Sequence, residues 1–215
     1  MKELALQHIN LVMKKVLIAL FCFSILSICN GQTLKDEYNE CAVEKYNLQD
    51  FKGAIEYFSR VIDLNPMDSI AYFDRAMAKE KDGDFKGAIE DYTKQIAIDS
   101  ENVDSYFLRG IAKYNLKKFD EANLDFLKTV YIEADNSDAY YYMSLSKTEL
   151  KKYTDAMDDC NMAIQLNAVN PKYYLHRGQL GLLLKQKDNA CQDFRTYMRF
   201  GGEQQNIPIK MPCGK

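Results

Sequence analysis

The feature that most constrains the fold of this chain is a strict sequence repeat. Its period is the interval from Ala54 to Ala88. Several positions recur at that spacing with no insertion between copies. One position holds only alanine, namely Ala54, Ala88, Ala122, Ala156 and Ala190, and another only tyrosine, namely Tyr38, Tyr72, Tyr106, Tyr140 and Tyr174. A third holds small residues, namely Ala42, Ala76, Gly110, Ser144 and Gly178, and a fourth holds Phe58, Tyr92, Phe126, Cys160 and Phe194. Such a period indicates that one supersecondary unit is repeated five times.

Each copy has the pattern of two helices. In the second copy, residues 70–79 carry apolar side chains at helical spacing, which predicts a first helix. Gly83 is suited to the turn that follows, and Asp84 is a candidate N-cap for a second helix over residues 85–98. Asn170 and Pro171 open the fifth copy as N-cap and first helical residue. The chain is therefore expected to be all-α.

The small residues explain how the two helices of a copy would pack. Alanine, glycine or serine on the first helix lets the second approach closely, and the aromatic residues then fill the space between neighbouring copies. No helix pair of this kind can bury its apolar face alone. Stacked copies sharing one extended core are expected.

This pattern resembles the tetratricopeptide repeat family, whose unit is about 34 residues long. The likeness rests on the small, aromatic and alanine series and on Leu64-Asn65-Pro66. The resemblance implies a right-handed α-solenoid of helix–turn–helix repeats over residues 35–202, followed by a C-terminal tail, 203–215. The five repeats are residues 35–68, 69–102, 103–136, 137–170 and 171–202. The chain departs from the family in having Tyr38 and its equivalents where tryptophan is usual, and arginines where leucine is frequent.

An apolar run near the N-terminus predicts an export signal. Lys14 and Lys15 precede an unbroken run of apolar or small residues, 16–29. A spanning helix needs about 20 such residues, whereas the core of a signal peptide needs about 7–15. Residues 1–31 are therefore expected to be cleaved before Gln32, leaving no membrane span. A start at Met13 is more typical of a signal peptide than a start at Met1, and Met1 stays open as the alternative. A lipid on Cys29 and an uncleaved anchor are the alternatives.

Export places the chain in the periplasm or outside the cell, where disulfides are permitted. Cys191 and Cys213 bracket the C-terminal segment and are predicted to pair, with two free thiols as the alternative. Cys41 and Cys160 are expected to be small core residues. The sequence contains no Cys-x-x-Cys spacing, so its cysteines do not suggest a metal site.

Charge and motifs argue against several classes of function. The net charge is −3 and no basic stripe is present, which argues against a nucleic-acid partner. No glycine-rich phosphate loop and no metal spacing appear, so neither a cofactor nor a metal is expected. After cleavage His176 is the one remaining histidine, and a nucleophilic mechanism would have to recruit it. An enzyme is not expected.

Three arginines on the first helices could be interpreted as a clamp for a ligand. Each is followed, at one constant interval, by an aspartate on the second helix of the same repeat: Arg75 with Asp91, Arg109 with Asp125, and Arg177 with Asp193. Ion pairs within each repeat are therefore predicted. Met143 with Asp159 breaks the rule.

The family resemblance implies that the first helices line a concave surface that binds a protein or peptide. The predicted binding residues are Asn39, Phe73, Met77, Phe107, Ile111, Tyr141, Tyr142, Leu145, Leu175 and His176. Aromatic residues in register would grip an extended or helical peptide. Alternatively, these rings extend the core between repeats. The chain is expected to be a monomer or bound to its partner, with a structural subunit of an envelope assembly as the alternative function.

Overall fold

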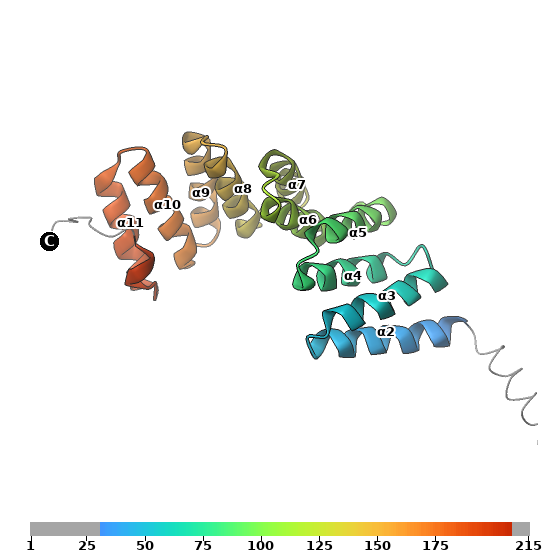
Figure 1. Ribbon diagram of the computed structural model, residues 1–215. Helices are drawn as coiled ribbons and strands as arrows, with labels where there is room; N and C mark the ends of the chain where they lie inside the picture. The colour runs from blue at the N-terminus through green and yellow to red at the C-terminus, as the bar shows by residue number, and fades with distance from the viewer. Residues whose placement is uncertain (1–30, 208–215) are drawn as a thin grey trace, which may run out of the picture. The chain divides into compact units, whose positions relative to one another are not determined.

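The computed structural model describes residues 31–207, and within that range it contains ten α-helices, one short 3-10 helix and no strand (Figure 1). The all-α prediction is thus confirmed. No helix in this range is long and apolar enough to cross a membrane. The predicted signal, apart from Gly31, and the alternative lipid site at Cys29 lie outside the described residues. The chain divides into two compact units, Met1–Ala71 and Tyr72–Lys215.

The N-terminal unit contains the first helix pair, α2 (Gly31–Asn47) and α3 (Phe51–Leu64), which pack against each other. Ala42, Ala54 and Phe58 are buried between them, at the positions that the repeat pattern marks. The Lys35 ammonium contacts the Asp68 carboxylate at 2.9 Å and so ties the start of α2 to the end of the first repeat.

The C-terminal unit continues the series of helix pairs. The third, fourth and fifth pairs pack internally, and from the second pair onward each second helix also contacts the first helix of the next pair. In the second pair, Ala76 of the first helix packs on Ala88 and Tyr92 of the second. The helices are α4 (Ser69–Asp82, which begins in the N-terminal unit), α5 (Phe85–Ile98), α6 (Val103–Asn115), α7 (Phe119–Ile132), α8 (Ser137–Glu149), α9 (Tyr153–Leu166), α10 (Pro171–Leu183) and α11 (Lys187–Arg199). The 3-10 helix Gln204–Asn206 follows, and Asn206 donates to the Tyr197 hydroxyl at 2.9 Å.

The small series packs the helices together as the sequence predicts. A Cβ atom added to Gly110 would lie 2.5 Å from Phe126 Cε1, and one added to Gly178 would lie 2.5 Å from Phe194 Cε1. Such distances are far below van der Waals contact, so these two crossings require glycine. Where the small residue is the larger Ser144, its neighbour on the second helix is a cysteine, Cys160.

Helix starts and turns also follow the sequence. Asp84 caps α5 by accepting from the Gly87 amide at 2.9 Å, and Asn170 caps α10 with Pro171 at its first position, as predicted. Gly83 has φ +87°, in the left-handed region that favours glycine. Lys117 and Lys151 take φ of +60° at the equivalent turns, so these lysines lie in the interhelical turns.

Gly83→Ala is expected to lower the free energy of unfolding by about 1 kcal/mol, because an L residue is strained at this φ. No atom lies within 4 Å of the added Cβ, so the cost arises from the backbone alone. Urea denaturation measures the effect. The control is Lys86→Ala, because Lys86 is exposed on the same helix pair. A surface change of this kind should alter stability by less than about 0.5 kcal/mol. Equal midpoints for Gly83→Ala and the native chain would contradict the account.

Candidate functional site

The predicted ion pairs form in all three repeats that carry the arginine. Each guanidinium donates from Nε and Nη2 to the two oxygens of its aspartate, at 2.7–2.9 Å. The three aspartates are buried, since none is more than 6% exposed. Each buried carboxylate therefore has a bidentate partner. These arginines join the two helices of one repeat and are committed to that contact.

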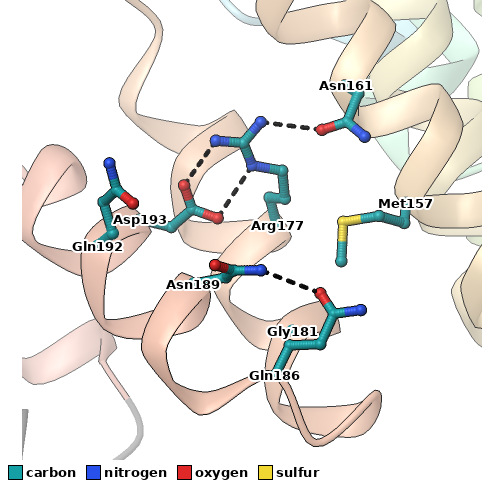
Figure 2. A pocket seen from close by; sticks show the side chains of 8 residues that line it. All are labelled: Met157, Asn161, Arg177, Gly181, Gln186, Asn189, Gln192 and Asp193. Carbon is teal, nitrogen blue, oxygen red and sulfur yellow. Dashed lines mark hydrogen bonds and ion pairs between the residues drawn. The ribbon is translucent and has the colours of Figure 1, made fainter.

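Two arginines also reach the preceding repeat. Arg109 Nη1 donates to Thr93 Oγ1 at 3.0 Å, and Arg177 Nη1 donates to Asn161 Oδ1 at 2.9 Å (Figure 2). This second contact was not expected from the sequence. In the sequence this contact is indicated only by a polar residue on the second helix of the preceding repeat. A polar residue is also expected at any exposed position, so it does not predict the contact.

The fourth repeat departs from the others, as its sequence indicates. Met143 is buried and packs on Ala122 and Phe126 instead of pairing with the aspartate. Asp159 has Lys147 as its cation, with 2.6 Å between Nζ and Oδ2. Burial raises the pKa of Asp159, and the contact with Lys147 opposes this rise.

Part of the predicted binding row joins one aromatic cluster, whose rings lie on α6, α7, α8 and α10. The Tyr142 ring lies 5.7 Å from Phe107, 5.6 Å from Phe126 and 5.7 Å from Tyr141, measured between ring centroids. Tyr141 in turn lies 5.1 Å from Tyr173. Burial raises the pKa of Tyr141 well above its ordinary value, so its hydroxyl stays protonated. The cluster therefore spans three consecutive repeats.

We call the surface that carries the predicted row on α4, α6, α8 and α10 the first-helix face. Most of its residues are partly exposed: Phe73, Met77, Phe107, Ile111, Tyr141, Tyr142, Leu145 and Leu175. Phe73 lies outside the cluster and packs on Tyr92, with 5.8 Å between centroids. Asn39 is partly exposed in the N-terminal unit, where it and Val43 border a shallow depression along α2.

His176 is the buried member of the predicted row, at 4% exposure. Its Nε2 lies 2.9 Å from Ser144 Oγ, and that hydroxyl donates to the Ala156 carbonyl at 2.6 Å. The serine oxygen therefore accepts from Nε2–H, which makes the imidazole a donor here. Burial lowers the pKa of His176 to about 4. Ser144 is fully buried and its proton is committed to a carbonyl, so this pair does not form an activated nucleophile.

An exposed apolar stripe on α7 was not expected from the sequence. Leu124, Leu127 and Tyr131 lie at helical spacing and are 66%, 45% and 81% exposed. The Lys128 ammonium lies 4.8 Å from the centroid of the Tyr131 ring. The periodicity of this helix alone does not distinguish such a stripe from a second buried face.

The cysteines separate into two kinds. Cys191 is disulfide-bonded. The predicted partner, Cys213, lies outside the described residues, so that pairing stays a prediction. Cys160 is a free, fully buried thiol whose pKa burial raises to about 12, in agreement with a core role. Cys41 is a free thiol but is partly exposed, so the expectation that it is a core residue was wrong.

Residues 42–103 match the family model of the tetratricopeptide repeat. No curated protein matches the sequence of the chain. Among solved structures, MamA residues 41-end from Desulfovibrio magneticus RS-1 have a TM-score of 0.75 at 16% identity, over 78% of this chain and 94% of that one. PilF of Pseudomonas aeruginosa has a TM-score of 0.69 at 20% identity, over 81% and 79%. YrrB, described as a TPR protein with an unusual peptide-binding site, has 0.69 at 11%, over 82% and 95%.

These similarities define the class of protein. The chain has the fold of helical-repeat proteins, which are built from consecutive helix pairs. Within that class, residues 42–103 are similar to the tetratricopeptide repeat, and the structural neighbours share the fold of the chain.

The buried, neutral state of His176 predicts a pH dependence. The folded pKa of about 4 lies below the unfolded value of about 6.5. The histidine therefore contributes stability that is present above about pH 6.5 and is lost as the pH falls toward about 4, by up to about 1.4 kcal/mol per pH unit. Urea unfolding of the native chain and of His176→Gln between these values measures the difference. The account would be contradicted if the free energy of unfolding fell equally in both proteins as the pH is lowered. It would also be contradicted if NMR gave the His176 imidazole a pKa near the unfolded value of about 6.5.

Proposed function

We propose that the chain is an exported scaffold that holds a protein or peptide partner on the first-helix face, in the periplasm or outside the cell. The apolar run 16–29 supports export. The disulfide at Cys191 fits an oxidising compartment. The buried aspartates and their arginine partners serve the fold, so these arginines are not candidates for binding a partner.

The observation that carries the proposal is the partly exposed aromatic cluster around Tyr142. Phe107, Tyr141 and Tyr142 are held by ring contacts on several sides, so little conformational freedom remains to be lost when a partner covers them. Rigid aromatic anchors of this kind contribute most of the affinity at many interfaces. The same contacts also make these rings part of the core between repeats, so a test by truncating them would confuse binding with folding.

Three aliphatic or thioether residues of the same face allow a cleaner test: Met77, Leu145 and Leu175. They are partly exposed and take no part in the ring contacts. The tagged full chain is expressed in its native host and crosslinked in cells, beside the triple variant Met77→Ala, Leu145→Ala, Leu175→Ala. Capture of the partner should fall at least about tenfold in the variant, which corresponds to about 1.4 kcal/mol of binding free energy.

The α7 stripe favours a second candidate function, a subunit that docks permanently into an envelope assembly. Exposed apolar patches commonly mark such contacts. The matched control is therefore the variant Leu124→Ala, Leu127→Ala, Tyr131→Ala, with helicity of all proteins checked by circular dichroism. Loss of the partner from this variant, and not from the first-helix variant, would contradict the proposal and favour the subunit.

A further inference from the structure

A lysine that recurs in the earlier repeats is replaced by glycine in the last repeat. In the second, third and fourth repeats this lysine contacts the buried aspartate of the second helix, with Nζ 2.6–2.8 Å from Oδ2: Lys79 with Asp91, Lys113 with Asp125 and Lys147 with Asp159. The fifth repeat has Gly181 at this position. Of the two contacts, one with an arginine and one with a lysine, the aspartate of this repeat, Asp193, makes the one with the arginine, Arg177.

A pocket of about 310 Å³ lies where the lysine side chain is missing. Gly181 and Asp193 line it, together with Arg177, Met157, Asn161 and Asn189 (Figure 2). A single water needs only roughly 10–15 Å³ of such volume, so the pocket has room for a larger group. Figure 2 shows Asp193 and Met157 on opposite sides of it.

We propose that this pocket binds a primary alkylammonium group, taking from outside the cation that the other repeats supply from their own helix. The Asp193 carboxylate would receive the ammonium, as Asp91 and Asp125 receive theirs. The side-chain oxygens of the amides that line the pocket, such as Asn189, offer further acceptors. The Met157 side chain provides an apolar wall for the alkyl chain.

The arginine already on Asp193 does not exclude a second cation. In the second repeat Asp91 accepts from Arg75 Nη2 at 2.7 Å and contacts Lys79 Nζ at 2.7 Å. In the third repeat Asp125 contacts Arg109 and Lys113 at 2.7 and 2.8 Å. One carboxylate thus holds two cations twice in this chain. An ammonium in the pocket would give the fifth repeat the same charge balance.

The test is a titration of the full chain with n-butylammonium chloride, which carries the missing part of a lysine side chain. Chloride is kept constant with sodium chloride. The NMR signals of the Gly181 amide and the Asn189 side-chain amide are expected to shift and saturate in the millimolar range. Gly181→Lys should abolish the shift, because its own ammonium then occupies the site. No saturable shift in the native chain, or the same shift in Gly181→Lys, would overturn the proposal and leave water as the occupant.

A second variant keeps the test decisive if Gly181→Lys does not fold. Lys113→Gly removes the equivalent lysine of the third repeat and leaves Asp125 with Arg109. It is expected to gain a second n-butylammonium site, reported by the amide of residue 113. A variant that folds and gains no site would show that a missing lysine does not suffice.

Three further measurements identify the source of the ammonium. A blocked Gly-Lys-Gly peptide that competes with n-butylammonium, while its norleucine analogue does not, identifies a lysine side chain of a partner as a competent ligand. Competition by free diamines alone identifies a small amine. The chain's own Lys210 and Lys215 are replaced by glutamine in a parallel sample. Tighter binding there would show that they compete for the same site.

Discussion

The close crossing of the two helices within each pair is the constraint on which the rest of the structure depends. A small residue on the first helix meets a larger one on the second, and their sizes compensate: Gly110 lies against Phe126, and Ser144 against Cys160. The arginine directly precedes the small residue, and the aspartate directly precedes the large one. The steric fit therefore sets the distance at which Arg109 and Asp125 form a bidentate pair.

Features that depend on one repeat were predictable from the sequence, because they follow from periodicity and local chemistry. The helix starts at Asp84 and Asn170 and the three arginine–aspartate pairs are of this kind. Features that depend on how neighbouring repeats stack were not predictable. The bond from Arg177 to Asn161 and the exposed stripe on α7 both belong here, since the repeat period fixes the content of a repeat but not the surface left open beside the next.

The site shows the same division. Spacing placed Phe107, Tyr141 and Tyr142 on the first helices. The contacts of Tyr142 with Phe107 and of Tyr141 with Tyr173 arise between repeats, however, and make these rings both core and surface. Single exchanges at repeated positions then give each copy its own character. Met143 turns a charged position into an apolar one, and Gly181 opens a pocket on Asp193. A regular scaffold with local exceptions offers distinct surfaces without changing its fold.

A double-mutant cycle tests the steric constraint most directly. Gly110→Ser and Phe126→Cys convert the crossing of the third repeat to that of the fourth. Each single change should destabilise, Gly110→Ser by overpacking at about 1–3 kcal/mol and Phe126→Cys by leaving a cavity at about 3–5 kcal/mol. In the double variant the loss should be smaller than the sum of the single losses by at least about 1 kcal/mol in urea unfolding. Additive losses would show that the two positions do not meet, and would contradict the account.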